Sequence, residues 1–347
     1  MLQDKIRVGF IGAGQNSRKL HIPKLLALPG VELREIANRT LASAEKVSSE
    51  FNIHKARASW QEIIASADID AIVIGTWPYL HCESTCAALE AGKHVLCEAR
   101  MAMNLSEAEQ MQKTSKAHPN LVSQLVPAPF TLHSDKTIRE YIDQDRLGDL
   151  LYFHADYQSN TVSSCSTPLH WRRNKKYSGE NTMVLGIIYE SICRWIPPAK
   201  MVNATGKIFN NNALDPETGE LVPVEIPDYL SIQMEMKNGI RGSMLLSETG
   251  LHSPCPSIKL FGTGGALKID LAPDGEIWYG AKSSDFMQEV KIRPQDKGYW
   301  RVEEEFINAI RGKENVQLTT FDAGVDYMSF TQAVMDSYRE NGRTKFL

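Results

Sequence analysis

The first part of the chain alternates short apolar runs with longer segments of helical spacing. Helical spacing appears in segments such as ASAEKVSSEF, HCESTCAALEAG and LSEAEQMQKTSKA. Between such segments lie apolar runs of strand length, among them IRVGFIG, AIVIGT and HVLCE. Strand, helix and strand repeated in this order predict βαβ units and a parallel sheet. We therefore expect an α/β domain over residues 1–125.

Beyond this part the pattern changes to strands at short intervals. Alternating segments such as LLYFHADYQ, YLSIQMEM, GSMLLS and ALKIDL indicate half-buried strands, and KNGI indicates a hairpin turn. Residues 126–347 are therefore expected to form a second, α+β domain with a large, mostly antiparallel open sheet. Because one face of such a sheet must meet water or a partner, the apolar alternation also predicts a homodimer or homotetramer.

Composition excludes several classes of partner. The 347 residues carry a formal net charge of -4 with acids and bases interspersed, so we expect no nucleic-acid and no membrane partner. The start of the chain lacks the pattern of a signal peptide, which favours a cytoplasmic protein. His81, Cys82 and Cys86 are spaced for one helix face, but no fourth ligand is in view. We therefore expect no metal site and six reduced thiols.

The segment VGFIGAGQNSRKLHI has the glycine pattern of a dinucleotide-binding turn. Gly12 and Gly14 stand between the first strand and the first helix, where glycine permits a tight turn and close approach of a pyrophosphate. Ser17 takes the place of a third glycine. The candidate cofactor-binding residues of this Rossmann-type domain are Gly12, Gly14, Gln15, Asn16 and Ser17.

The end of the second strand, EIANRT, bears on the choice of cofactor. An acidic residue at this point would accept hydrogen bonds from the adenosine ribose. Asn38 carries no charge that repels a 2′-phosphate, and the guanidinium of Arg39 is suited to bind one. The segment favours NADP, with NAD as the second possibility; alternatively, Arg39 is only solvated.

The segment DAIVIGTWPYLHCESTCAALEAGKHVLCEARMAMN resembles the glucose-fructose oxidoreductase and inositol dehydrogenase family, written Gfo/Idh/MocA. The segments HWRR, LFGTGGALKID and VEEEFINAIRG extend the resemblance over nearly the whole chain. The resemblance implies a homo-oligomer and hydride transfer between nicotinamide C4 and a sugar, polyol or related hydroxy or keto compound. It implies cofactor contacts from Thr76, Trp77, Glu98 and His81; for His81, a contact at the helix start without a ligand is the alternative. Gln124, at the end of the strand candidate NLVSQL, is expected to approach the nicotinamide. It implies substrate contacts from His170, Trp171 and Arg172, for which structural packing is the alternative.

The chain departs from the family at its usual acid-base positions. Ala99 replaces the lysine of the E-K-P motif, Arg100 replaces its proline, and Val184 and Ile188 stand where the family has aspartate and histidine. We expect the next residue, Tyr189, to be the general acid or base, with Arg100 as its electrostatic partner. Because one residue along a helix rotates a side chain by about 100°, Glu190 is the second candidate.

Three functions therefore remain open. The first is an NAD(P)-dependent oxidoreductase acting on a small, polar, carbohydrate-like substrate. The second is a lyase or hydrolase that oxidises its substrate transiently and recycles a bound cofactor. The third is a dinucleotide-binding regulator without turnover.

Overall fold

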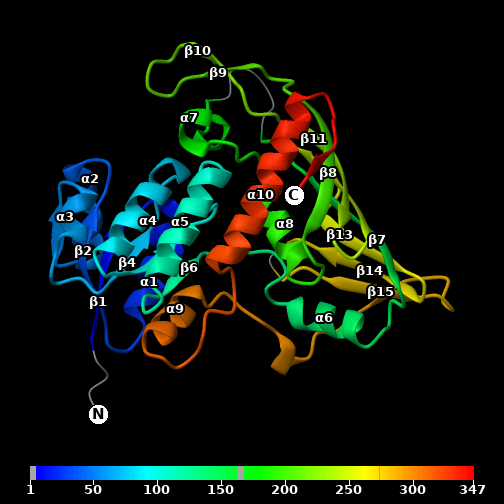
Figure 1. Cartoon of the computed structure of the whole chain (residues 1–347), viewed down its shortest axis with the longest axis horizontal. Coiled ribbons are helices and arrows are strands. Elements are labelled where there is room, and N and C mark those ends of the chain that lie inside the picture. Colours follow the sequence, from blue (N-terminus) through cyan, green and yellow to red (C-terminus); the bar gives the residue numbers. More distant parts are fainter. Residues whose placement is uncertain (1–4, 162–167, 273) are drawn as a thin grey trace. The chain divides into compact units, whose positions relative to one another are not determined.

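The computed structural model describes residues 5–161, 168–272 and 274–347, which form two compact units (Figure 1). Unit 1 contains Met1–Pro127 and Arg301–Val325, and unit 2 contains Ala128–Trp300 and Asp326–Leu347. The chain first passes from unit 1 to unit 2 after Pro127, two residues beyond the predicted end of the first domain at residue 125. Arg301–Val325, which that boundary assigns to the second domain, is instead part of unit 1.

Unit 1 is built on a parallel sheet with the strand order β3-β2-β1-β4-β5-β6. Its central strands are nearly continuous apolar runs because helices cover both faces of the sheet. The strand order reverses between β1 and β4, as in doubly wound dinucleotide-binding folds. The strands are β1 (Ile6–Ile11), β2 (Val31–Ala37), β3 (Lys55–Arg57), β4 (Ala71–Ile74), β5 (His94–Cys97) and β6 (Ser123–Leu125).

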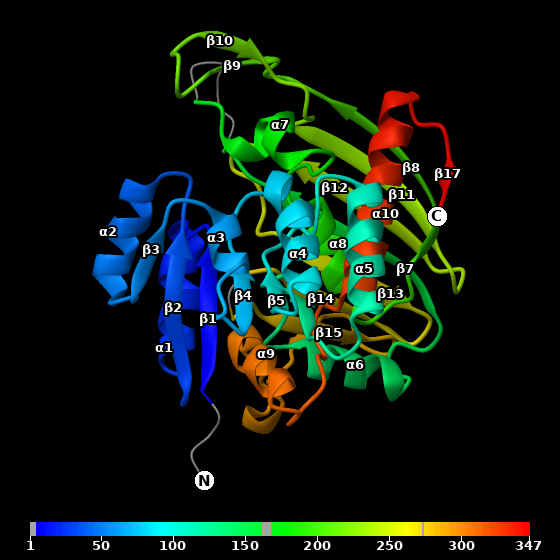
Figure 2. The same cartoon turned by 60° about the vertical axis from the view of Figure 1, so that its left-hand side comes forward.

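Three helices of unit 1 begin where a short polar side chain accepts a hydrogen bond from the first turn. Thr40, Ser59 and Asn104 cap α2, α3 and α5 in this way. In both views α4 and α5 lie side by side (Figures 1 and 2), and α1 contacts α9, which the late segment of the chain contributes. The elements are η1 (Ser17–His21), α1 (Ile22–Leu26), α2 (Leu41–Phe51), α3 (Trp60–Ile64), η2 (Pro78–Leu80), α4 (His81–Glu90), α5 (Leu105–Ala117) and α9 (Val302–Ile310).

Unit 2 is built on a sheet with the order β16-β15-β14-β13-β7-β12-β11-β8-β17. Its pairs are antiparallel except β7 with β12, and Lys237–Ile240 form the predicted turn between β11 and β12. A separate antiparallel pair joins β9 (Asn212–Leu214) and β10 (Leu221–Pro223). The sheet strands are β7 (Leu150–Gln158), β8 (Ala199–Lys207), β11 (Tyr229–Met236), β12 (Arg241–Ser247), β13 (Ser257–Gly262), β14 (Gly265–Asp270), β15 (Ile277–Ala281), β16 (Gln288–Glu289) and β17 (Lys345–Phe346).

Helices cover one face of this sheet. Residues of α10 run along β8 and β11 (Figure 2), where the Ala204 N–H donates to Ser337 Oγ at 2.8 Å and Gly206 leaves room for Tyr338. The helical elements of unit 2 are α6 (Asp135–Asp143), η3 (Trp171–Arg173), α7 (Lys175–Ser178), α8 (Leu185–Cys193), η4 (Pro294–Asp296) and most of α10 (Phe321–Arg339).

The apolar alternation in β11 belongs to the covered face. Leu230, Ile232 and Met234 are buried, whereas the alternate residues Ser231 and Gln233 lie on the opposite, more polar face. The apolar residues from which oligomerisation was predicted are therefore used inside unit 2. Homo-oligomerisation itself stays a prediction.

The described residues offer neither a membrane-spanning helix nor a cluster of metal ligands. Within them no helix is both long and apolar enough to cross a membrane. They likewise hold no group of three or more histidine, cysteine or acidic side chains arranged for a metal ion. Cys82 and Cys86 are buried free thiols on α4, and Cys165 lies outside the described residues.

Candidate functional site

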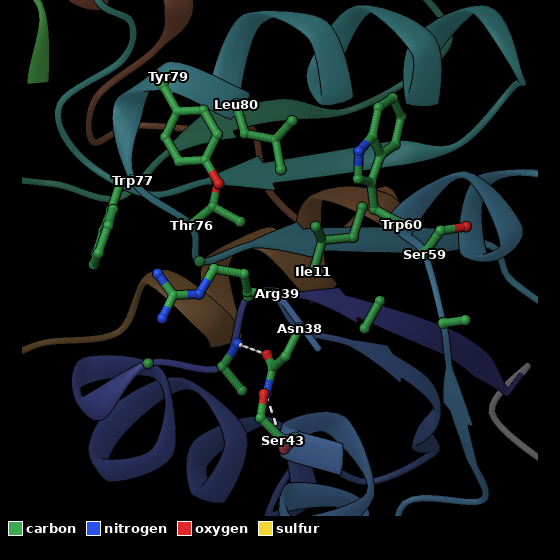
Figure 3. Close-up of a pocket in the computed structure, with 16 residues that line it drawn as sticks. Ile11, Asn38, Arg39, Ser43, Ser59, Trp60, Thr76, Trp77, Tyr79 and Leu80 are labelled. Atoms are coloured by element: carbon green, nitrogen blue, oxygen red, sulfur yellow. Dashed lines mark hydrogen bonds between the residues drawn. The ribbon is translucent and has the colours of Figure 1, made fainter. Parts of the chain in front are cut away.

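A cavity of about 540 Å³ lies at the carboxyl ends of β1, β2 and β4 in unit 1 (Figure 3). This edge, beside the point where the strand order reverses, is where open parallel sheets bind ligands. The lining residues come from four loops: Ile11, Gly12, Ala13, Gly14, Ala37, Asn38, Arg39, Ser43, Ala58, Ser59, Trp60, Gly75, Thr76, Trp77, Tyr79 and Leu80. Six of the predicted cofactor contacts are thus brought together: Gly12, Gly14, Asn38, Arg39, Thr76 and Trp77.

The two glycines of the turn are required for different reasons. Gly12 has φ +83°, and a Cβ there would lie 2.4 Å from Thr76 Cγ2, so the fold itself requires glycine. A Cβ at Gly14 would meet no atom within 4 Å. The space beside Gly14 is therefore open for a ligand to approach the backbone.

Thr76 supplies a second feature that fits a bound ligand. Its Oγ1 is buried and has no hydrogen-bond partner among the residues that the structure describes. Because buried polar atoms are nearly always hydrogen-bonded, this hydroxyl is suited to a polar group in the cavity. Together, the open space at Gly14 and the unsatisfied Thr76 hydroxyl fit a dinucleotide.

Asn38 has a structural role that the sequence did not indicate. Its Oδ1 accepts from the Ala13 N–H at 2.7 Å, and its Nδ2 donates to the Ser43 carbonyl at 3.1 Å (Figure 3). The side chain therefore ties the glycine turn to the start of α2. Arg39 is exposed and lines the cavity. It is therefore the remaining candidate for discriminating between NADP and NAD.

Trp60 and Tyr79 also line the cavity but were not predicted. In the view of Figure 3, Arg39, Trp77 and Tyr79 occupy one side of the cavity and Trp60 the other. Tyr79 stands inside the segment TWPYLH, so the family resemblance offered a signal for it. Trp60 follows β3, whose three residues are too few and too polar to be recognised as a strand.

Glu98 lies directly after β5 and joins several groups. Its Oε1 accepts from Asn16 Nδ2 and from His21 Nε2, the latter at 3.0 Å, and its Oε2 accepts from the Ala99 N–H at 3.0 Å. Burial acts to raise the pKa of Glu98, but the His21, Asn16 and Ala99 hydrogen bonds outweigh it and lower the pKa. Glu98 is therefore an ionised carboxylate fixed beside the glycine turn.

The other two predicted residues of the turn, Gln15 and Ser17, differ in exposure. Gln15 is exposed, and Ser17 is buried with its hydroxyl donating to the Gly12 carbonyl at 3.3 Å. A Cβ at Gly75 would lie 2.4 Å from Ser17 Oγ, so these two residues pack closely. Ser17 therefore supports the turn from inside unit 1.

His21 was missed by the sequence reading. It is fully buried, and its Nδ1 lies 2.7 Å from Glu303 Oε1 while its Nε2 contacts Glu98. Burial acts to lower the pKa of His21, but the two carboxylates raise it to about 9. Because Glu303 stands 282 residues away, no local pattern indicates this pairing.

His81 and Gln124 have internal partners in place of the predicted cofactor contacts. The ring of His81 is buried, with Nδ1 2.9 Å from the Arg100 carbonyl and Nε2 3.0 Å from the Thr76 carbonyl. Desolvation lowers the pKa of His81. Gln124 is buried and donates to Glu305 Oε2 at 2.6 Å. Neither residue lines the cavity, and His81 instead holds together the loops after β4 and β5.

Tyr189 occupies the interior of unit 2, contrary to its predicted role. Its ring stacks on Phe330 with centroids 3.7 Å apart, and its hydroxyl accepts from the Ala199 N–H at 2.7 Å. The side chain is fully buried, and desolvation raises the pKa of Tyr189. The rotation of about 100° per residue turns this phenol into the core, where it cannot exchange a proton with substrate.

The second candidate, Glu190, is also committed to the interior. Its two carboxylate oxygens accept from Arg194, each at 3.0 Å, and Oε2 also accepts from the Ala128 N–H at 2.7 Å. Arg194 also binds Asp135 and the carbonyls of Ala128 and Phe130. Glu190 therefore anchors the chain that leads into unit 2, which opposes a role as the base.

The predicted substrate residues form a cluster around η3. The Arg172 guanidinium lies 4.3 Å from the centroid of the Trp171 ring, and the His170 ring centroid lies 5.6 Å from that of Trp171. Burial and the nearby Arg172 lower the pKa of His170, so its ring is neutral at neutral pH. Arg173, by contrast, is buried and pairs with the buried Asp228 at 3.6 Å.

Comparison with known families matches both parts of the chain. Residues 6–125 match the oxidoreductase family with an NAD-binding Rossmann fold, GFO/IDH/MocA, and residues 136–268 match the GFO/IDH/MocA C-terminal domain. The matched ranges cover most of the chain and include the cavity.

Individual relatives have low sequence identity to this chain. The chain is 24% identical over 260 residues to levoglucosan dehydrogenase of Pseudarthrobacter phenanthrenivorans, covering 68% of this chain and 64% of that protein. It is 24% identical over 268 residues to trans-1,2-dihydrobenzene-1,2-diol dehydrogenase of Sus scrofa, covering 76% of this chain and 74% of that protein.

Solved structures agree on the fold. Levoglucosan dehydrogenase in complex with NADH and L-sorbose has a TM-score of 0.86 and 21% identity, and covers 99% of this chain and 98% of its own. Its complex with NADH and levoglucosan has a TM-score of 0.85 and 21% identity, with 99% of each chain covered. At this identity the likeness shows the fold alone.

Proposed function

Because the chain belongs to the Gfo/Idh/MocA family of NAD-binding oxidoreductases, we propose that it transfers hydride between a nicotinamide dinucleotide and a sugar, polyol or related hydroxy or keto compound. The observation that carries the proposal is the cavity at the glycine turn, with open space at Gly14 and a buried, unsatisfied hydroxyl on Thr76. The relatives named for sugar-type substrates support the carbohydrate class.

The cavity residues have distinct roles in holding the dinucleotide. The Gly12–Gly14 turn lets a pyrophosphate approach the backbone, Asn38 keeps that turn in place, and Arg39 offers a cation. When bound, the dinucleotide supplies the hydride acceptor or donor at nicotinamide C4.

The candidate substrate contacts of unit 2 are the residues around η3, and the candidate of unit 1 is Arg100. The exposed edge of the His170–Trp171–Arg172 cluster offers an aromatic ring for the apolar face of a sugar and polar atoms for its hydroxyls. Arg100 is buried and always protonated, so it stabilises negative charge on a reacting oxygen. Tyr189 and Glu190 have no part in this scheme.

One alternative has an observation in its favour. Val184 and Ile188 are apolar, Tyr189 is hydrogen-bonded to Ala199, and Glu190 is paired with Arg194. The usual acid-base positions are therefore left without a proton carrier. A dinucleotide-binding protein without turnover would tolerate this. Following nicotinamide absorbance with a panel of sugars and their keto forms separates the two, because a binding protein leaves the absorbance unchanged with every compound.

The two glycines of the turn are expected to respond differently to alanine. Gly14→Ala should leave the free energy of unfolding unchanged and raise the Kd of the dinucleotide by about tenfold or more, since the new methyl occupies the approach to the backbone. Gly12→Ala should lower the free energy of unfolding by about 1–3 kcal/mol, because of its φ and the contact with Thr76. Denaturant unfolding and fluorescence titration with NADH and NADPH measure both effects. An unchanged Kd in Gly14→Ala would place the dinucleotide elsewhere.

Arg39 is expected to set a preference for NADPH over NADH. Arg39→Met should weaken NADPH by about tenfold and leave NADH nearly unchanged, because only the former carries the 2′-phosphate. Asn38→Ala is the comparison, since loss of its links to Ala13 and Ser43 should weaken both dinucleotides alike. Equal affinities for the two in the parent protein would refute the preference.

A further inference from the structure

Three segments that are distant in sequence meet at His21. The imidazole comes from η1, Glu98 follows β5, and Glu303 comes from α9 of the late segment. The side chains of His21 and Glu303 are 0% and 1% exposed, and that of Glu98 is 13% exposed. The three form a nearly buried Glu–His–Glu cluster inside unit 1.

The geometry of the cluster specifies the protonation state of the ring. Each ring nitrogen faces a carboxylate oxygen, and ionised carboxylates only accept hydrogen bonds. A neutral imidazole has a single N–H, whereas the imidazolium has two. The arrangement is therefore satisfied fully only when His21 is charged.

The cluster continues to the surface of the dinucleotide-binding turn. Glu98 Oε1, which His21 contacts, also accepts from the side chain of Asn16, an exposed residue two positions after Gly14. Asn16 is thus tied to α9 through Glu98 and His21. Asn16 and Glu98 lie at the carboxyl edge of the sheet. A change of charge or hydrogen bonding in the cluster therefore alters the proposed cofactor site.

We propose that His21 is a positioning residue of the dinucleotide site: its imidazolium fixes Glu98 and Asn16 beside the glycine turn and makes dinucleotide affinity depend on its proton. The inference rests on the proposed function. With the proton present, the cluster has a net charge of -1. Loss of the proton makes it -2 and removes a hydrogen bond, both of which oppose an anionic pyrophosphate nearby.

The other charged groups on the surrounding segments either form ion pairs with other residues or lie farther from the cluster along those segments. On η1, Arg18 pairs with Glu50, and Lys19 is exposed. At the start of α9, Arg301 pairs with Glu314. Arg100 follows Glu98 by two residues, and α9 also carries Glu304 and Glu305, of which Glu305 binds Gln124. The charges that act on the ionisation of His21 are those of Glu98 and Glu303.

The direction of the pH dependence follows from the raised pKa of His21. The stabilisation from its proton is complete below the unfolded-state value of 6.5, declines as pH rises, and is lost once pH passes about 9. Dinucleotide affinity compares free and bound folded protein, so it should be constant below the free-state pKa of about 9 and fall as pH rises above it. By linkage, binding of a dinucleotide near pH 9 should be accompanied by proton uptake.

The test compares the Kd of NADH and NADPH in four proteins between about pH 7 and about pH 10. In the parent, affinity should fall by about tenfold or more, and calorimetry in buffers of different ionisation enthalpy should show proton uptake. Glu303→Gln removes one of two charges and should move the midpoint down by about one pH unit or more. Glu304→Gln, on the same helix with a 41% exposed side chain, should behave like the parent.

His21→Gln should bind more weakly than the parent at neutral pH and show no change of affinity across the range. Parent affinity that is flat over this range, or a midpoint that Glu303→Gln leaves in place, would overturn the inference and leave dinucleotide binding intact. Failure of the parent to bind either dinucleotide at any pH would overturn the proposed function itself. Because the proton-uptake measurement uses the unaltered protein, it decides the question even where a variant does not fold.

Discussion

Replacing Arg100 with methionine is expected to lower turnover by about 100-fold or more, with the Kd of the dinucleotide nearly unchanged. Arg100 is 4% exposed and follows Glu98 by two residues, and its carbonyl oxygen is held by His81. A permanent positive charge in such a buried place stabilises an alkoxide far more than it would in water. Methionine keeps the apolar stem and removes the charge.

Arg100→Lys is the matched variant for this prediction. It restores the charge without the forked donor, so turnover should recover in part. Single-turnover kinetics at saturating dinucleotide, with denaturant unfolding of each variant, separate the effect on chemistry from an effect on folding. Turnover of Arg100→Met within a few-fold of the parent would remove Arg100 from the reaction.

Arg194→Met is expected to destabilise unit 2 by about 3–5 kcal/mol, since it leaves buried carboxylates without their cation. The Arg194 side chain is 8% exposed and donates to Glu190, Asp135 and two backbone carbonyls. Urea unfolding measures the change. Arg339→Met removes a more exposed pair with Glu180 and should cost less than about 1 kcal/mol. Comparable losses in the two variants would show that Arg194 and its partners stabilise unit 2 no more than a surface ion pair does.

The sheet of unit 1 could be predicted because its buried strands are continuous apolar runs between amphipathic helices. The short and polar β3 has no such signal. The return of Arg301–Val325 to unit 1 was not predictable either, because α9 shows only that one of its faces is apolar and not which core it covers. Contacts between distant segments carry no local pattern.

The candidate site likewise contains residues that the local sequence could place and residues that it could not. Gly12 and Gly14 could be placed because their strand and helix are adjacent in sequence. The structural use of Asn38 depends on where Ala13 and Ser43 come to lie, which a motif does not state. For Tyr189, a register one residue past the expected histidine was enough to turn the side chain from the proposed site into the core.

The central claim is that the cavity of unit 1 holds a nicotinamide dinucleotide that exchanges hydride with a carbohydrate. The most direct measurement incubates the protein with reduced dinucleotide deuterated at C4 and with aldoses, ketoses and the keto forms of inositols and anhydrosugars in turn, and follows the label by mass spectrometry. The account predicts transfer of deuterium from the dinucleotide to at least one compound, and little transfer with Gly14→Ala below saturation. Full retention of the label with every compound, although the dinucleotide is bound, would contradict hydride transfer and leave a binding protein without turnover.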